Sequence, residues 1–215
     1  MKTVMLLFPG FTALDAIGPY HALGHLPGYE FAFVAEQAGP VGNGGSFTME
    51  AQLGIDEVSE VDLLIVPGGV SAIELSRTGH RLIDWIREVH PTTQWTTSVC
   101  TGALMLGAAG ALEGKRATTH WYSHTELARF GAIPTDERVV FDGKVVTAAG
   151  VSAGIDMALM LTERIAGLQY AQATQLDMEY DPRPPFDAGH PRCAPAEVTT
   201  WLRDMYDSML GTPPA

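Results

Sequence analysis

Cys100 is the residue best placed to do chemistry, because it lies between a predicted strand and a predicted helix. Residues Trp95 to Val99 are mostly β-branched or aromatic, as strands prefer, and Ala103 to Leu112 is rich in helix formers. Gly102 allows a tight turn between the two. The unpaired N–H groups and partial positive charge at a helix N-terminus favour a thiolate over a thiol. The pattern indicates a cysteine nucleophile, and the structural alternative is a small buried apolar side chain.

Two other predicted strand ends carry unusual residues. The first leads through Phe8-Pro9-Gly10 to Asp15 at the start of a helix, and another ends at Pro67-Gly68-Gly69-Val70. If these strands flank the Cys100 strand, an acid, a possible oxyanion hole of backbone N–H groups and a thiol converge. Taken alone, Asp15 is typical of an acidic residue in the first turn of a helix. The pair Gly68-Gly69, taken alone, is typical of a tight turn with no catalytic role.

The elements that must position these residues alternate between strand and helix. Short apolar runs predict buried strands, and Asp142-Gly143 predicts a hairpin turn. The alternation predicts an α/β fold with a mostly parallel sheet, helices on both faces, and the site beyond the carboxyl ends of the strands. We expect strands at 4–8, 31–35, 62–66, 95–99, 117–119, 139–141 and 144–147, helices at 14–23, 82–89, 103–112, 122–130, 152–166 and 197–210, a turn at 39–45 and a loop at 181–195.

The length, charge and cysteine count of the chain limit the expected number of domains, the partners and the compartment. The chain has 215 residues, 46% of them hydrophobic, which predicts one domain over 1–215 with a substantial core. The formal net charge is −12, with only 13 Lys and Arg, so neither nucleic acid nor an anionic membrane surface is an expected partner. Two cysteines fit a reducing cytoplasm better than a disulfide framework. The first apolar run stops at Pro9-Gly10, so it reads as a strand and not a signal peptide, and no apolar stretch predicts a membrane span.

These residues resemble a known family. The segment Asp62 to Gly69 and the run Ser98-Val99-Cys100-Thr101-Gly102 are similar to the ThiJ/PfpI superfamily of class I glutamine-amidotransferase-like folds, over almost the whole chain. Within it, the chain most resembles the isonitrile hydratase branch. The motifs that carry this likeness are Phe8-Pro9, Leu14-Asp15, Gly18-Pro19, Cys100-Thr101-Gly102, Lys115 to Trp121, Ala153 to Asp156, Glu179-Tyr180 and Pro184-Pro185-Phe186.

The resemblance implies a flavodoxin-like three-layer sandwich that forms a homodimer, with the thiol on a strained elbow near the subunit interface. It also implies that Cys100 is the thiol and Asp15 the acid, with Thr101 beside them. Many peptidase-like members have a histidine where this chain has Thr101, so a peptidase would lack its base. The DNA-binding relatives carry an additional helix-turn-helix domain. Because this chain ends at Ala215 and is acidic, we do not expect such a domain or DNA binding.

The chemistry expected from the resemblance is hydration of an isonitrile to an N-substituted formamide. Cys100 adds to the terminal carbon while Asp15 supplies a proton, and Asp15 then activates the water that releases the product. Backbone N–H groups of Gly69 and Thr101 are expected to hold developing charge, and the Thr101 hydroxyl to orient water. No metal or organic cofactor is expected.

Other residues have weaker claims. Gly68, Val70, His120 and Trp121 are possible pocket residues, although a lone histidine is more often a satisfied structural group. Asp156 is typical of an acidic residue near the start of a helix, and it could also hydrogen-bond to the turn at Cys100. Cys193 stands in a proline-rich loop and lacks the partners of a zinc site, so we treat it as incidental. Two alternatives stay open: a glyoxalase or deglycase acting on 2-oxoaldehydes, and a non-catalytic redox sensor in which Cys100 is oxidised.

Overall fold

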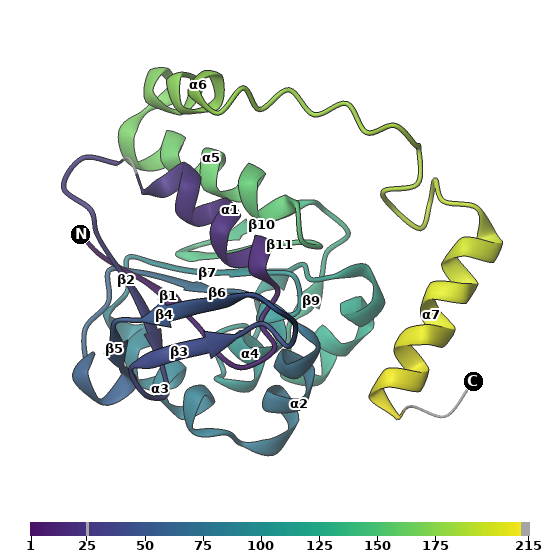
Figure 1. Cartoon of the computed structure of the whole chain (residues 1–215), viewed down its shortest axis with the longest axis horizontal. Coiled ribbons are helices and arrows are strands. Elements are labelled where there is room, and N and C mark those ends of the chain that lie inside the picture. The colour runs from purple at the N-terminus through teal and green to yellow at the C-terminus, as the bar shows by residue number, and fades with distance from the viewer. Residues whose placement is uncertain (25, 212–215) are drawn as a thin grey trace. The chain divides into compact units, whose positions relative to one another are not determined.

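A seven-stranded sheet organises the unit Met1–Met178 of the computed structural model, which describes residues 1–24 and 26–211 (Figure 1). The strand order is β10-β11-β7-β6-β1-β2-β5, and every neighbouring pair is parallel except β10 and β11. The predicted hairpin at Asp142-Gly143 is this antiparallel pair. The strands are β1 (Lys2–Leu6), β2 (Glu30–Ala35), β5 (Leu53–Gly54), β6 (Leu63–Val66), β7 (Trp95–Val99), β10 (Val139–Asp142) and β11 (Val145–Ala148).

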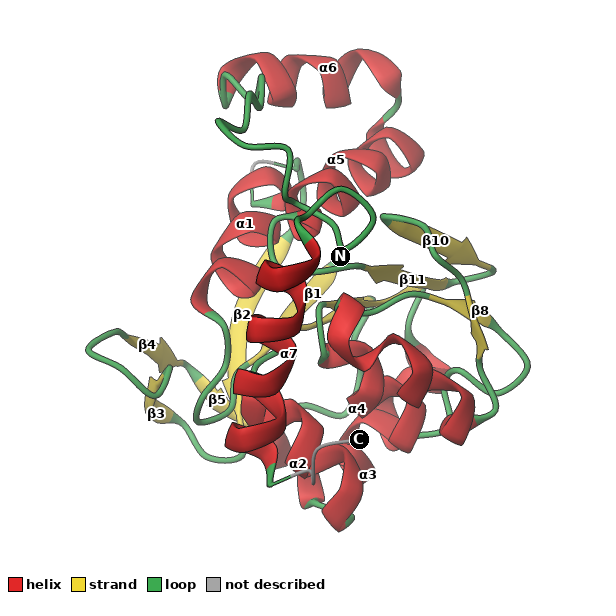
Figure 2. Ribbon diagram, turned by 90° about the vertical axis from the view of Figure 1, so that its right-hand side faces the viewer, coloured by secondary structure: helices red, strands yellow, loops and turns green. Residues whose placement is uncertain are grey.

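Helices cover both faces of this sheet (Figures 1 and 2). On one face α1 (Ala13–Leu23) packs against α5 (Ala153–Ala166), which in turn contacts α6 (Leu168–Asp177). On the other lie α2 (Val70–Thr78), α3 (Arg81–Val89) and α4 (Gly102–Ala108). The three-layer α/β architecture predicted from the sequence is therefore confirmed.

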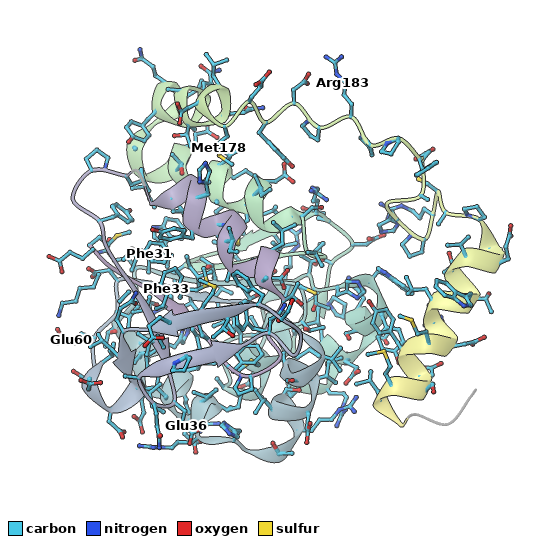
Figure 3. The ribbon with its side chains drawn as sticks, viewed as in Figure 1. Phe31, Phe33, Glu36, Glu60, Met178 and Arg183 are labelled. Carbon is cyan, nitrogen blue, oxygen red and sulfur yellow. The ribbon has the colours of Figure 1, made fainter. Side chains whose placement is uncertain are left out.

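Burial explains the strands at the centre. All four residues of β6 are buried, as are four of the five in β1 and in β7, so both faces of these strands are covered by helices. Towards the edge, Tyr20 of α1 meets two phenylalanines of β2, which Figure 3 labels. The centroid of the Tyr20 ring lies 4.9 Å from that of Phe31 and 5.2 Å from that of Phe33. Aromatic packing therefore holds α1 against this strand.

Several local predictions were wrong. The glycine-rich segment 39–45 was expected to be a turn, but Gly39–Gly42 forms β3, which pairs with β4 (Thr48–Ala51). The expected helix at 122–130 is a 3₁₀ helix, Trp121–Phe130. The strand expected at 117–119 is β8 (Arg116–Ala117), which pairs with β9 (Ile133–Pro134). The helices α2 and α6 were not predicted, and short 3₁₀ helices occupy Ile55–Glu57 and His90–Thr92.

The second unit begins at Glu179. Residues 179–195 contain neither helix nor strand, as the proline-rich sequence predicted, and α7 (Ala196–Leu210) follows them. Across the ranges that the structure describes, no helix combines the length and apolar character that crossing a membrane requires.

Candidate active site

The ends of three adjacent strands form the site, as the sequence predicted. β1 pairs with β6, and β6 with β7, all in parallel, so their carboxyl ends lie side by side. The loop after β1 leads to Asp15 in the first turn of α1, the loop after β6 holds Gly68 and Gly69, and Cys100 follows β7 directly. The acid, the glycine loop and the thiol therefore come together at one edge of the sheet.

Cys100 is held in a left-handed backbone conformation, with φ of 56°. This conformation is costly for a residue with a Cβ, so the surrounding bonds must hold it in place. Its N–H lies 3.1 Å from the carbonyl oxygen of Ala148 and 2.9 Å from that of Ala149, and its own carbonyl accepts a 2.7 Å hydrogen bond from Thr119 Oγ1. The sharp turn predicted at the cysteine is thus a strained elbow.

Glycines let the backbone segments of the site approach each other closely. A Cβ on Gly102 would lie 2.2 Å from the Val66 carbonyl oxygen. A Cβ on Gly68 would lie 2.6 Å from the Thr101 nitrogen, and one on Gly69 2.3 Å from the Gly10 carbonyl oxygen. Any larger residue at these positions must push the loop away from the elbow.

The Thr101 side chain is hydrogen-bonded to the glycine loop and to the Cys100 side chain. Its hydroxyl accepts a 2.9 Å hydrogen bond from the Gly69 N–H and donates a 2.8 Å bond to the Gly69 carbonyl. The Gly69 N–H was expected to be available for an oxyanion, and the Thr101 hydroxyl for a water molecule. Both groups bond each other instead, so this pair joins the elbow to the loop after β6.

Asp15 is completely buried, with 0% of its surface exposed. Its Oδ2 accepts a 2.9 Å hydrogen bond from the Gly68 N–H, and Oδ1 has no hydrogen-bond partner among the described residues. Burial raises the pKa of this carboxyl to about 7, although the Gly68 N–H and the neighbouring Cys100 side chain favour the charged form. The sequence-based expectation of a raised pKa agrees with this environment, and a carboxyl that titrates near neutral pH suits acid–base catalysis.

The Cys100 thiol is also buried, with 5% of the residue exposed. Burial, and then the negative charge of Asp15, raise the pKa of this thiol to about 12. The Thr101 N–H at the helix N-terminus favours the thiolate, as expected, but loss of hydration outweighs it. The backbone N–H groups of Thr101 and Val151 oppose the shift. Val151 was not predicted, since a backbone donor in the loop between β11 and α5 leaves no signature in the sequence.

Together, Cys100 and Asp15 hold a proton between them near neutral pH. Between pH values of about 7 and 12 the pair keeps one proton, which rests mainly on sulfur. Moving that proton to Asp15 creates a thiolate beside a carboxylic acid without taking a proton from solvent. The arrangement can therefore supply a nucleophile and an acid at the same moment.

The remaining predicted residues lie around this pair. Gly68 binds Asp15 directly, and Val70, half exposed, begins α2. Burial lowers the pKa of His120 to about 4, so this histidine is neutral; its ring contacts that of Trp121 with a centroid distance of 5.5 Å. It also lies against the loop after β11, where a Cβ on Gly150 would be 2.9 Å from its Cδ2. The place of His120 and Trp121 in a pocket wall stays a prediction.

Two other residues have simple local settings. Asp156 forms an ion pair with Arg138, whose Nε donates to Oδ2 at 2.6 Å. Cys193 is an exposed free thiol in the segment before α7. Within residues 1–24 and 26–211, no three His, Cys, Asp or Glu side chains gather in a way that could hold a metal ion.

Comparison with known proteins agrees with this geometry. Residues 1–164 match the model of the DJ-1/PfpI family. The chain is 42% identical over 198 residues to the isonitrile hydratase of Pseudomonas putida, covering 92% of this chain and 86% of that protein. It is 30% identical over 149 residues to a deglycase of Thermococcus kodakarensis, covering 68% and 89% respectively.

A solved structure resembles nearly the whole chain. The ThiJ/PfpI family protein of Pseudomonas syringae is 35% identical, with a TM-score of 0.90, and the match covers 98% of this chain and 88% of that one. Drosophila melanogaster DJ-1beta, 18% identical with a TM-score of 0.70, shares the fold over 83% of this chain and 97% of its own. The strained cysteine elbow, the buried acid and these matches lead to one conclusion: the chain belongs to the DJ-1/PfpI family.

Proposed function

We propose that this protein is an isonitrile hydratase that converts an isonitrile and water into an N-substituted formamide. The observation that carries the proposal is the buried Cys100–Asp15 pair, in which the Cys100 side chain is hydrogen-bonded to a carboxyl whose pKa burial raises. The similarity to the isonitrile hydratase of Pseudomonas putida supports the same reaction, of the lyase class.

The first step adds the thiol across the terminal carbon of the isonitrile. Asp15 takes the proton from the Cys100 sulfur and passes it to that carbon, while the sulfur forms a bond to the same carbon. The carbon–nitrogen triple bond becomes a double bond, and the product is a thioimidate on Cys100. Asp15 ends this step as a carboxylate, as it began.

The second step hydrolyses the thioimidate. Asp15 removes a proton from water as the oxygen attacks the former isonitrile carbon, and it delivers that proton to the nitrogen. The carbon–sulfur bond of the tetrahedral intermediate then breaks, and the hydroxyl proton returns through Asp15 to sulfur. The formamide leaves and the thiol is restored, so one water molecule is consumed and no electrons are exchanged.

The electrostatics of the pair favour a neutral substrate. Among the described residues, no lysine, arginine or histidine contributes to the pKa shift of either Asp15 or Cys100. An isonitrile carries no net charge and can enter such a site without needing a counterion. The backbone N–H groups of Thr101 and Val151 and the Thr101 side chain are the donors that stabilise charge on sulfur, while the Gly69 N–H bonds the Thr101 hydroxyl.

Two alternatives predict different behaviour. A deglycase or glyoxalase, suggested by the likeness to the Thermococcus kodakarensis protein, would act on a 2-oxoaldehyde. A redox sensor would need an exposed thiol of low pKa, whereas Cys100 is buried and its pKa is raised. Burial therefore favours catalysis over sensing.

A parallel assay tests the proposal. The purified full chain is given cyclohexyl isocyanide or methylglyoxal, and formation of N-cyclohexylformamide or loss of the aldehyde is followed by chromatography. We expect formamide from the isonitrile, none with Cys100→Ala, and nearly unchanged turnover with the matched control Cys193→Ala. Consumption of methylglyoxal without any formamide would show that the deglycase alternative is correct.

A further inference from the structure

Thr119 is a buried residue that contacts the elbow without taking part in the proposed proton transfers. It lies two residues after β8, and only 1% of its surface is exposed. Its Oγ1 donates a buried 2.7 Å hydrogen bond to the carbonyl oxygen of Cys100. The segment Lys115 to Trp121, which carries part of the family likeness, therefore reaches the nucleophile through one hydroxyl group.

The carbonyl that Thr119 binds belongs to the same peptide unit as the Thr101 N–H. A trans peptide unit is planar, so its C=O and N–H groups point in opposite directions and turn together. Together with the Val151 N–H, the Thr101 N–H favours the charged form of the Cys100 sulfur. A bond that fixes the oxygen of this unit therefore also fixes the direction in which its N–H points.

The strained backbone at the elbow needs such a bond. With φ of 56°, Cys100 occupies a conformation that its surroundings must maintain. The N–H of Ala103 also points to the Cys100 carbonyl, but at 3.4 Å it lies beyond the usual hydrogen-bond distance. The bond from Thr119 is much the shorter, so it contributes most to the orientation of the unit. It also polarises the peptide, which makes the Thr101 N–H a better donor to a thiolate.

The segment that carries Thr119 is itself tied to the sheet. The N–H of Thr118 donates a 2.9 Å hydrogen bond to Oγ1 of Thr147, and both residues are buried. Thr147 lies in β11 and pairs with Ser98 of β7, two residues before the elbow. The Thr119 hydroxyl is therefore held by the strand next to the one that leads to Cys100, so it can serve as a fixed anchor.

We propose that Thr119 is a positioning residue for the reaction: its hydroxyl orients the Cys100–Thr101 peptide unit so that the Thr101 N–H holds the sulfur as negative charge develops there. The role rests on the proposed function, because the charge in question is the one that sulfur carries as its proton moves to Asp15. Thr119 transfers no proton itself. Without its hydroxyl the peptide unit can turn, while the Val151 N–H and the Thr101 side chain remain as donors to sulfur.

Steady-state kinetics of the full chain test this role with a matched control. Thr119→Val removes the hydroxyl and keeps the shape of the side chain, whereas Thr119→Ser keeps a hydroxyl. Thr97→Val is the control, because Thr97 is also fully buried and its Oγ1 donates to a backbone carbonyl, that of Leu64, at 3.0 Å.

The account predicts a loss in kcat that only the Thr119 hydroxyl explains. Removing an entire oxyanion donor costs on the order of 10² to 10³ in kcat, so a misdirected donor beside two remaining ones should cost about tenfold in Thr119→Val. KM should change by less than about twofold, because the charge on sulfur is absent when the substrate binds. Thr119→Ser should restore kcat, and Thr97→Val should leave it nearly unchanged.

Alkylation of Cys100 gives a second readout that needs no isonitrile. Iodoacetamide reacts with the thiolate, and peptide mass spectrometry distinguishes Cys100 from the exposed Cys193. At pH 8, modification of Cys100 should slow by about tenfold in Thr119→Val, which corresponds to one pKa unit, recover in Thr119→Ser and match the wild type in Thr97→Val.

A second variant covers the case in which Thr119→Val does not fold. Thr119→Ala also removes the hydroxyl, but it places no methyl group against the Cys100 carbonyl, and it should slow alkylation to the same extent. Alkylation that is unchanged or faster in the folded variant, or equally slowed in Thr97→Val, would overturn the positioning role. A wild type that makes no formamide would refute the proposed hydratase function and leave the alkylation comparison to decide the role of Thr119.

Discussion

At the scale of single residues, burial sets the chemistry of the site. Removal from water raises the pKa of both Asp15 and Cys100, because each loses hydration of its charged form. The helix N-terminus beside Cys100 was expected to dominate, yet its N–H groups only moderate the effect. The result is a neutral thiol next to a carboxyl that titrates near pH 7, and this combination makes the reaction depend on pH.

The first prediction is the pH dependence of kcat/KM. The form that reacts holds one proton between Cys100 and Asp15, and a second proton binds Asp15 below a pH of about 7. The rate should therefore rise tenfold per pH unit below about 7 and level off above it. A stopped-time assay of formamide from pH 5 to pH 9 measures this, and a rate that increases towards acid would contradict the one-proton form.

The second prediction concerns stability in the variant Asp15→Asn. The folded pKa of about 7 lies above the ordinary aspartate pKa of 3.8, so the folded state binds this proton more tightly and loses stability as pH rises from about 4 to about 7. Each pKa unit corresponds to ~1.4 kcal/mol, so the burial of a charged Asp15 costs up to about 4 kcal/mol at pH 8. Asparagine keeps the shape and can still accept from Gly68, without the charge.

Urea unfolding at two pH values checks that prediction. At pH 8, Asp15→Asn should be more stable than the wild type by a few kcal/mol, while turnover falls on the order of 10² to 10⁴-fold because the amide transfers no proton. Near pH 4 the stability gain should vanish. Equal stability at pH 8 would mean that Asp15 is not a strained, buried charge, whatever its effect on the rate.

At the scale of elements, the site depends on how the elbow after β7 is joined to the loop after β6. The Thr101 hydroxyl bonds the N–H and the carbonyl of Gly69 and also the Cys100 side chain, and Gly68 in the same loop donates to Asp15. The Thr101 side chain therefore positions the loop that binds Asp15, and its hydrogen bond to Cys100 also favours the thiolate.

The third prediction follows from this link. Thr101→Val leaves the buried Gly69 N–H without its acceptor and should destabilise the protein by about 1–3 kcal/mol, while the Gly69 carbonyl keeps a bond from the Ala72 N–H. A looser loop weakens the Gly68 bond that favours the charged form of Asp15, so the pH midpoint of the rate should move upward. Thr101→Ser retains the hydroxyl and should restore the midpoint. An unchanged midpoint in Thr101→Val would remove the positioning role.

The same scale explains which parts of the fold the sequence could predict. The strands β1 and β6 were predictable because burial on both faces leaves an apolar run, and β7 because most of its residues are β-branched or aromatic. Their adjacency could only be assumed, yet it brings Asp15, Gly68 and Cys100 together. By contrast, α2 begins at Val70 directly after Gly69 and has weak helical patterning, so its sequence resembles a continuation of the loop.

Some contacts at the site could not be predicted from the sequence because they depend on the position of the backbone in space. Residue types identified Cys100 and Asp15, but backbone donors such as the Val151 N–H depend only on where a loop lies in space. The pairing of Thr101 with Gly69 likewise follows from a close approach of two backbones, which the glycines permit but do not specify. Sequence reasoning therefore anticipated that Cys100 and Asp15 lie together, but not the bonds that Thr101 and Gly69 make to each other.

At the scale of the whole molecule, the chain consists of the unit Met1–Met178 and a second unit that begins at Glu179 and contains α7. The elbow, the acid and the glycine loop all belong to the first unit, which therefore contains every reacting group in the proposed mechanism.

The central claim is that the Cys100 sulfur bonds to the isonitrile carbon with Asp15 moving the proton. Intact-protein and peptide mass spectrometry after rapid acid quench tests it most directly. Because S–H adds across the carbon, the account predicts a transient gain of one whole isonitrile mass on the Cys100 peptide of the wild type, none on the Cys193 peptide, and a much smaller yield in Asp15→Asn. Formamide production without any adduct on Cys100, or an adduct that forms as fast in Asp15→Asn as in the wild type, would contradict it.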